Sequence, residues 1–540
     1  MIILETTLNN LVHKIDELHD GYSKVFVSLG NENSKAYVRL IKNTNHLKSQ
    51  LMKQTQKYKK KNGLFPKWIK VDVVTGEETM TFDRVEKMLI NTRRNYIDFG
   101  LVLDQQWQLA FLPEEINANA FVRPSKKDKN SKEIAENNIT HYLKNYRKLN
   151  INFKVEDFRN EDVVVFQTKG YFVEGDTILE LHSTDGMKGI RKIEDLHTEI
   201  DQLISTSTTF LKNEIQPNGE YIYGYFPHFD RKINYYNILR HSSSTYALTE
   251  GLSYLNEDVS IVRKPLNYII ENCLLEKEDE AYIFDKTNGI NEIKLGQNAA
   301  FIFAVCEYIK MNPDENYYLK YAQKVAKGIL SMINMNSMDF IHVLNYPDLS
   351  IKERFRVIYY EGETALALLR LYQVDGHSEW LETVEKIFEK FINEGYWKYH
   401  DHWLGYCTNE LVKIVPKEQY YTFGIKNVAN YLDFIYQRET TFPTFLELLM
   451  ATYHLIQDAK RNGFEDLVQS LIDEEQLLST IHRRADYQRT GYFYPEIAMY
   501  FKNPKRILGS FFIKHHGFRV RIDDIEHYLS GYIQYQKVFK

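Results

Sequence analysis

The stretch Tyr360-Glu-Gly-Glu-Thr-Ala-Leu-Ala-Leu368, together with residues 379–393 that follow it, decides the fold. The first stretch is rich in small and apolar residues and carries few charges along its length. The second repeats Glu and Lys on one face, as at Glu382, Lys386 and Glu389. A helix that is apolar nearly all round is buried, whereas a helix with a single apolar stripe lies on the outside. The two stretches therefore predict an inner helix followed by an outer helix.

The same alternation extends over about 340 residues, from residue 196 to the last residues of the chain. Caps, glycines and prolines delimit twelve predicted helices, in which the even-numbered members have the inner character. Their spans are 196–214, 235–253, 259–275, 297–311, 315–334, 361–374, 377–393, 402–414, 417–436, 443–459, 463–484 and 523–537. Six inner and six outer helices in strict alternation predict an (α/α)6 barrel, and strands are not expected in this part.

The first 195 residues have a different character. Strand-like alternation occurs in several segments: 22–29, 35–41, 68–74, 97–103, 108–112 and two or three within 150–182. Helical spacing occurs in residues 1–19 and 81–94. The sequence thus predicts a mainly α protein with a smaller α+β domain over residues 1–195 and a barrel domain over residues 196–540.

Composition limits the partners. The chain has 540 residues and a formal net charge of −5, so it lacks the basic footprint of a nucleic-acid-binding protein. A short basic loop at residues 126–129 is expected to be solvated. No apolar stretch approaches the ~18 residues of a membrane span, and no targeting segment is recognisable. The three cysteines are far apart and lack metal-ligand spacing, which favours a reduced, cytoplasmic compartment.

Residues 195–540 resemble the six-hairpin, (α/α)6-barrel proteins, which are mostly carbohydrate-active enzymes. The resemblance is carried by the general pattern and by two strings, Arg240-His-Ser-Ser-Ser-Thr-Tyr-Ala-Leu248 and residues 360–368. The group includes glycoside hydrolases, unsaturated-uronyl hydrolases and N-acylglucosamine 2-epimerase-like isomerases. The resemblance implies a soluble, bacterial-like protein that acts on a carbohydrate, with no single family assignable and no catalytic residue carried over.

In such a barrel, polar residues at the start of each inner helix are the place to look for chemistry, because helix amino termini favour anionic or polar ligands. The candidate catalytic residues are Glu361, Glu363, Asp523, Asp524 and His241. The candidate substrate-binding residues are Arg240, Tyr225, His228, Tyr360, His402, Trp403, Arg519, Arg521 and His527. Aromatic rings suit the C–H faces of sugars, whereas carboxylates and arginines suit their hydroxyls.

Three functions remain open. Glycoside hydrolysis of an acidic or amino-sugar oligosaccharide would pair Glu361 or Glu363 with Asp523 or Asp524, one as acid and one as base. A sugar epimerase or lyase would instead use a histidine base, for which His241, His402 and His527 are the candidates. A glycan-binding accessory protein of a polymer-synthesis pathway would use the same residues without chemistry.

Structural roles compete with each functional role. First-turn carboxylates also complement the helix dipole, and Asp523 or Asp524 could cap its helix. Because the twelfth helix should close the ring against the first hairpin, we expect Arg240 to pair with Asp523 or Asp524. The paired histidines at 400 and 402 do not have metal-ligand spacing, and phosphate-binding glycine loops are missing, so no metal and no cofactor are predicted.

Overall fold

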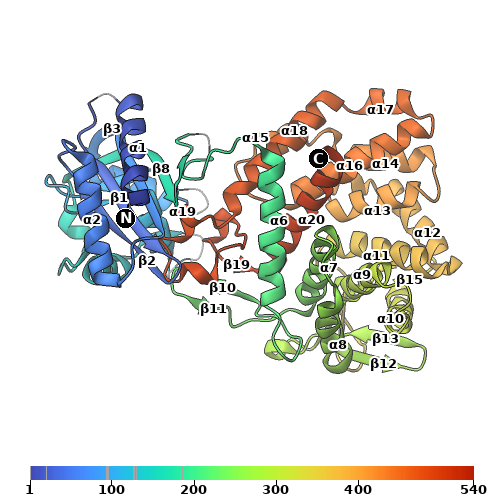
Figure 1. Ribbon diagram of the computed structural model, residues 1–540. Helices are drawn as coiled ribbons and strands as arrows, with labels where there is room; N and C mark the ends of the chain where they lie inside the picture. Colours follow the sequence, from blue (N-terminus) through green and yellow to red (C-terminus); the bar gives the residue numbers. More distant parts are fainter. Residues whose placement is uncertain (1, 20, 93–95, 126–127, 129–130, 185) are drawn as a thin grey trace. The chain divides into compact units, whose positions relative to one another are not determined.

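The computed structural model describes residues 2–19, 21–92, 96–125, 128, 131–184 and 186–540 (Figure 1). The chain folds into two compact units. Unit 1 holds Met1–Glu194, Tyr225–Arg231 and Thr490–Val520, and unit 2 holds Asp195–Gly224, Lys232–Arg489 and Arg521–Lys540. Two segments that lie within the predicted barrel domain therefore belong to unit 1. Of the basic loop at 126–129, only Asp128 is among the described residues.

Unit 1 is built on an antiparallel sheet with strand order β2-β1-β3-β8-β4-β5, with β9 also paired to β8. The strands are β1 (Val25–Asn31), β2 (Ser34–Ile41), β3 (Trp68–Thr81), β4 (Gly100–Val102), β5 (Ala110–Phe111), β8 (Asp162–Glu174) and β9 (Thr177–Glu180). The strands β6 (Val122–Pro124) and β7 (Lys132–Ile134) form a separate hairpin. The helices of unit 1 are α1 (Ile2–Leu18), α2 (Leu47–Asn62), α3 (Phe82–Asn91), α4 (Pro113–Ala118), α5 (Glu136–Tyr142) and α19 (Pro495–Ala498).

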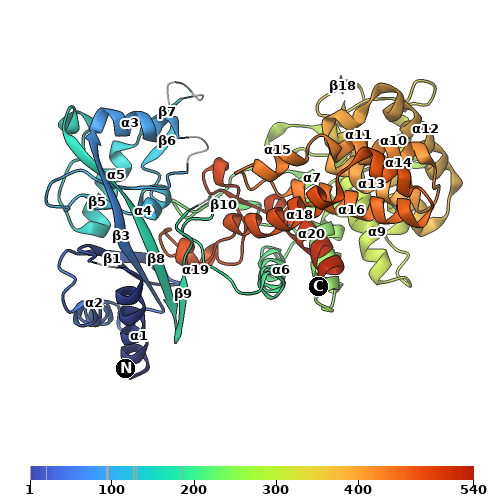
Figure 2. The ribbon, with the colours of Figure 1, turned by 90° about the horizontal axis from the view of Figure 1, so that it is seen from above.

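The long strands β3 and β8 pair with each other, with α1 and α2 near one end of the pair and α3 and α5 near the other (Figure 2). Two hydrophobic clusters pack against this pair. One cluster packs α1 and α2 against one end of the pair, around Val71 and Val173. The other packs α3 and α5 against the opposite end, around Met80 and Val163. The predicted α+β domain is thus built on one sheet that has two hydrophobic cores. Its strand β3 continues for seven residues beyond the predicted strand end at Val74.

Unit 2 contains a closed ring of inner helices. Each inner helix contacts the next one along the chain, and the last contacts the first. They are α7 (Ile238–Tyr254), α9 (Leu295–Met311), α11 (Tyr359–Asp375), α13 (His402–Val412), α16 (Thr444–Arg461) and α20 (Ile522–Phe539). Their burial on nearly every side explains why their sequences are apolar or small all round.

Outer helices lie against this ring and carry single apolar stripes. They are α6 (Leu196–Asn213), α8 (Arg263–Asn272), α10 (Leu319–Ser331), α12 (Ser378–Glu394), α14 (Glu418–Ala429) and α18 (Glu474–Gln488), with the short α15 (Leu432–Gln437) and α17 (Glu465–Leu471) beside them. In α12, for example, Trp380, Val384 and Phe388 are buried. α6 contacts both α7 and α20, and α18 contacts α16 and α20. Unit 2 is therefore an (α/α)6 barrel, as predicted.

Three details differ from the prediction, and one of them is that the helix predicted at 417–436 is two helices, α14 and α15. The expectation of no strands after residue 195 is wrong, because short hairpins join the helices and two to four residues are too few to show an alternating pattern. They are β12 (Leu274–Lys277), β13 (Glu280–Ile283), β14 (Glu292–Lys294), β15 (Ile333–Asn334), β16 (Asp339–Phe340), β17 (Val343–Asn345) and β18 (Ile351–Glu353); β10 (Gly224–Phe226), β11 (Arg231–Lys232) and β19 (Val520–Arg521) lie where the chain passes between units. The predicted helix at 463–484 is two helices, because Asp473 caps α18 by accepting from the Gln476 N–H. Within the part of the chain that the structure describes, no helix is long and apolar enough to cross a membrane.

Candidate active site at the amino ends of the inner helices

The first turns of the inner helices meet at one end of the ring. Arg240 of α7 contacts Asp523 of α20, and Ser243 of α7 donates to Glu526 of α20 at 2.5 Å. The side chain of Glu363 of α11 lies against the start of α9. We call the residues gathered here the rim site. It is formed by Arg240, Glu363, Asp401, His402, Trp403, Glu447, Arg521, Asp523, Asp524, Glu526 and His527.

An arginine–carboxylate network lies where α20 meets α7. The Arg240 Nε atom lies 3.4 Å from Asp523 Oδ2, so the expected pair is present. Arg521 holds Asp524 through two hydrogen bonds of 3.0 and 2.7 Å and lies 3.3 Å from Asp523. Neither aspartate occupies the N-cap position of α20, because Arg521 does, and the Arg521 side chain makes no cap hydrogen bond. Arg240 is about one-third exposed (35%), so solvent reaches this network.

Glu363 is a buried carboxyl group of a different kind. Its Oε2 atom has no hydrogen-bond partner among the described residues and lies so close to Gly296 that a Cβ there would be 2.1 Å away. The ring of Tyr360, a predicted substrate-binding residue, packs at the same point. Burial raises the pKa of Glu363 to about 8, although the Arg240 charge opposes this rise. Glu363 is therefore protonated at neutral pH, as a general acid must be.

Two histidines from different inner helices are in contact at the rim site. The rings of His402 (α13) and His527 (α20) are 5.3 Å apart between centroids, in an edge-to-face arrangement. His527 Nδ1 lies 2.9 Å from Glu447 Oε2 in α16, and the same oxygen is 4.0 Å from His402 Nε2. Burial raises the pKa of Glu447 to about 8 and lowers the pKa of His527. The three side chains form one cluster that could exchange protons or hold a metal ion.

Asp401 orients the first turn of α13. Its Oδ1 atom accepts a hydrogen bond from the Trp403 N–H at 3.0 Å and lies 3.3 Å from His402 Nδ1. A carboxylate at this distance favours the tautomer with its proton on Nδ1, which leaves His402 Nε2 as a lone-pair atom. His402 Nε2 is buried and has no hydrogen-bond partner in the described part of the chain. The Trp403 ring completes this wall, 6.2 Å from the ring of His527.

Two predicted catalytic residues have structural partners instead. His241 Nδ1 accepts from the Tyr236 hydroxyl at 2.6 Å, and its Nε2 donates to the Pro265 carbonyl oxygen at 3.0 Å. Both ring nitrogens are thus used, and burial lowers the pKa of His241 to about 4. Glu361 accepts from His342 Nε2 at 3.1 Å. These partners belong neither to the histidine pair nor to the arginine network.

Three predicted substrate-binding residues belong to unit 1, because the segments that carry them leave the barrel. The guanidinium carbon of Arg506 lies over the ring of Tyr225, 5.2 Å from the ring centroid. His228 packs between the rings of Phe501 and Phe518, and burial lowers its pKa to about 4. The third is Arg519, in the segment Thr490–Val520. They are not part of the rim site of unit 2.

Sequence reasoning missed Asp401, Glu447 and Glu526. Burial raises the pKa of Glu526 to about 7, although His527 and the Ser243 hydrogen bond oppose the rise. A usable signal existed for Glu447, which interrupts the apolar run Phe445-Leu-Glu-Leu-Leu449 at the fourth residue of its helix. A carboxyl on an inner helix that is buried by its neighbours needs a reason other than the helix dipole.

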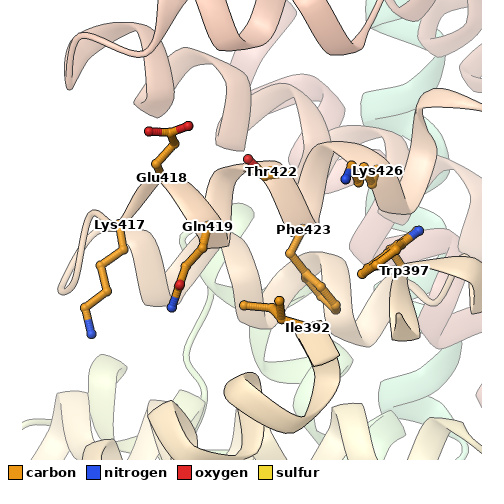
Figure 3. Close-up of a pocket in the computed structure, with 8 residues that line it drawn as sticks. All are labelled: Ile392, Trp397, Lys417, Glu418, Gln419, Thr422, Phe423 and Lys426. Atoms are coloured by element: carbon orange, nitrogen blue, oxygen red, sulfur yellow. The ribbon is translucent and has the colours of Figure 1, made fainter. Parts of the chain in front are cut away.

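A concavity lies on the outside of the barrel, over α14 and the turn that precedes α13 (Figure 3). It has a volume of about 580 Å³, and its lining includes Trp397, Phe423 and Lys426. The Lys426 ammonium lies 5.2 Å from the Trp397 ring centroid, so the ring is already in contact with a cation. No residue of the rim site lines this groove.

No protein-family model matches this chain, and no curated protein matches it. Solved structures are similar to it in fold. D-mannose isomerase is 9% identical over 64% of this chain and 100% of its own, with a TM-score of 0.48. Cellobiose 2-epimerase from Bacillus thermoamylovorans is 12% identical over 63% and 98%, with a TM-score of 0.47. The cellulase Cel9M of C. cellulolyticum is 11% identical over 64% and 100%, with a TM-score of 0.41. The (α/α)6 architecture of unit 2 rests on its own closed ring of inner helices, and no single family is assignable to the chain.

Proposed function

We propose that unit 2 is a carbohydrate-active enzyme that moves protons on a reducing sugar, as an epimerase or isomerase, with His402 and His527 as the two proton carriers. The observation that carries this proposal is the contact between two imidazole rings from separate inner helices, which lie edge to face with their centroids 5.3 Å apart. Imidazole is the side chain best suited to take up and release protons at neutral pH.

The geometry supports a division of roles. The Nε2 atom of His402 has no hydrogen-bond partner among the described residues, and Asp401 lies 3.3 Å from the Nδ1 atom of the same ring. His402 would take the proton from the carbon next to the sugar carbonyl. His527, hydrogen-bonded to Glu447, would return a proton. Removal of a proton from this carbon leaves negative charge on the carbonyl oxygen, and Arg240 is the rim cation exposed enough to stabilise that charge.

Solvent exchange tests this proposal without knowledge of the natural substrate. The protein is incubated in D2O with reducing hexoses, amino sugars, uronic acids and disaccharides, and deuterium incorporation at C2 is followed by NMR. We expect exchange with at least one sugar, and a loss of about 100-fold or more in His402→Asn and in His527→Asn. The exposed His377→Asn is the matched control and should keep full exchange. Exchange with none of these sugars, or full exchange in both variants, would refute the proposal.

Glycoside hydrolysis is the second candidate, and a separate observation favours it. Glu363 is protonated at neutral pH, whereas Asp523 lies beside the guanidinium groups of Arg240 and Arg521. Two carboxyl groups whose environments differ in this way are the acid and base that hydrolysis needs. Reducing ends released from uronic-acid or amino-sugar oligosaccharides, and lost in Glu363→Gln while His402→Asn keeps them, would favour this function. Sugar binding without either reaction would favour an accessory glycan-binding role.

A further inference from the structure

We propose that His402, Glu447 and His527 form a binding site for one divalent transition-metal ion of the zinc class. Each residue offers one ligand atom, and these atoms all lie within 4.8 Å of one another. They come from the amino ends of three inner helices, α13, α16 and α20, so the ring itself sets their spacing. Two imidazoles and one carboxylate are a ligand set that zinc uses in proteins.

The distances fit a metal after small side-chain movements. Glu447 Oε2 lies 2.9 Å from His527 Nδ1 and 4.0 Å from His402 Nε2. Nitrogen and oxygen ligands at 2.0–2.1 Å from a tetrahedral ion are about 3.3 Å apart. These two distances lie within about 0.7 Å of that value, and the third, between the imidazole nitrogens of His402 and His527, is at most 4.8 Å. Movements of the three side chains would bring the ligand atoms together around an ion.

The unpartnered nitrogen of His402 is the independent observation that points to a ligand. The residue is 7% exposed, and its Nε2 has no hydrogen-bond partner among the described residues. A buried polar atom without a partner is costly, and a bound cation would satisfy this one. Asp401 lies 3.3 Å from the other ring nitrogen, as the outer-shell carboxylate of a metal-bound histidine does.

The surrounding charge favours a cation. Asp523 and Asp524 balance the guanidinium groups of Arg240 and Arg521, which leaves Asp401 and Glu447 as the carboxyl groups beside the two histidines. The side chain of His527 is 13% exposed, so the site is not sealed from solvent. Three protein ligands with a fourth position left to water or a sugar hydroxyl describe an open zinc site rather than a structural one.

Metal binding has a defined proton balance and a consequence for the reaction. The ion replaces the proton shared between His527 Nδ1 and Glu447, and that proton passes to water. The ion also occupies the lone pair of His402 Nε2. This consequence rests on the proposed function: a metal-loaded rim site cannot take up the sugar proton at His402, so the ion acts as a reversible inhibitor.

Cobalt titration tests the site in the absence of sugar. The full-length protein is stripped with EDTA, dialysed and titrated with Co²⁺, whose visible absorption reports coordination by nitrogen and oxygen ligands; Zn²⁺ is then added as competitor. We expect one Co²⁺ per chain, displaced by one Zn²⁺, and an affinity lower by more than tenfold in Glu447→Gln and in His527→Gln. Asp401→Asn should lose between about 10-fold and 100-fold. The matched control, His377→Gln, should bind as the wild type does.

The outcomes separate the metal site from the proposed function. Absence of stoichiometric Co²⁺ binding, or unchanged affinity in folded Glu447→Gln and His527→Gln, overturns the metal site. Circular dichroism establishes that each variant is folded, and His402→Gln replaces any variant that is not. Co²⁺ binding without deuterium exchange on any sugar supports the metal site and refutes the proposed function. Exchange that EDTA leaves intact and Zn²⁺ abolishes supports both, whereas exchange insensitive to Zn²⁺ contradicts the inhibition.

Discussion

Replacement of Glu363 by glutamine should make the barrel more stable, and increasingly so as the pH rises. The carboxyl is 5% exposed, and burial raises its pKa from 4.5 to about 8. Between these two values the folded protein keeps a proton that the unfolded chain releases, so wild-type stability falls with increasing pH in that window. One pKa unit corresponds to about 1.36 kcal/mol, so the loss from pH 5 to pH 7 is about 2.5 kcal/mol.

Glutamine cannot ionise and does not undergo this loss. Urea unfolding of the wild type and of Glu363→Gln at half-unit steps from pH 5 to pH 8 measures the difference directly. The free energy of unfolding of the variant, relative to the wild type, should rise by about 2.5 kcal/mol between pH 5 and pH 7. Glu418→Gln, on the exposed start of α14, is the control and should give a flat difference. A flat or inverted profile for Glu363→Gln would refute the argument that this carboxyl is neutral in the folded barrel.

Further perturbations follow from the same contacts. Gly296→Ala should cost about 1–3 kcal/mol, because its Cβ would lie 2.1 Å from Glu363 Oε2; thermal unfolding measures the loss. His241 has its pKa lowered to about 4, so the stability that it contributes is present above pH 6.5 and is lost as the pH falls towards 4; His241→Gln should therefore differ most from the wild type at pH 7. Asp524→Asn should abolish the two-bond pair with Arg521 and cost about 3 kcal/mol, more than the ~1 kcal/mol of a lost cap, as urea unfolding would show.

Each of these has its own control. Gly531→Ala, on α20, meets Leu446 at 3.3 Å, a tight contact but a longer one than at Gly296, and should cost less; equal losses at both glycines would contradict the packing argument. An unfolding difference for His241→Gln that is the same at pH 4 and pH 7 would contradict a neutral buried imidazole. A stability of Asp524→Asn within about 1 kcal/mol of the wild type would mean that Arg521 is satisfied without its partner.

Periodicity along the sequence predicts the helices well because it records which face of each helix is buried. The span predicted for α11, 361–374, lies within the observed Tyr359–Asp375. The predicted helix at 417–436 is two helices, because the chain turns at Asn430 and Tyr431; periodicity missed the break, since no glycine or proline marks that turn. The alternation of apolar and polar residues also predicts the strands of the first 195 residues. It does not predict that β3 and β8 contribute to two separate hydrophobic cores.

Pairings between distant segments are what periodicity cannot supply. The pair of Arg240 and Asp523 was predictable because ring closure places the last helix beside the first. Glu447 was missed because its partners, His402 and His527, lie far away along the chain on other helices. His228 was assigned to the barrel by its position in the chain, and only the contacts place it in unit 1. Sequence patterns thus locate the rim site, and geometry decides which side chains form it.

Both units of the protein are completed by segments near the end of the chain, which the ribosome makes last. Unit 1 begins at the first residues, yet Tyr500 donates to Ser28, 472 positions earlier, and Arg191 forms a two-bond pair with Glu496. The ring of unit 2 likewise lacks a closing member until α20 has been made. Contacts between residues this far apart in the sequence form slowly, because closing the long loop between them costs conformational entropy. During synthesis, both units therefore carry uncovered apolar surface until Thr490–Val520 and α20 have been made.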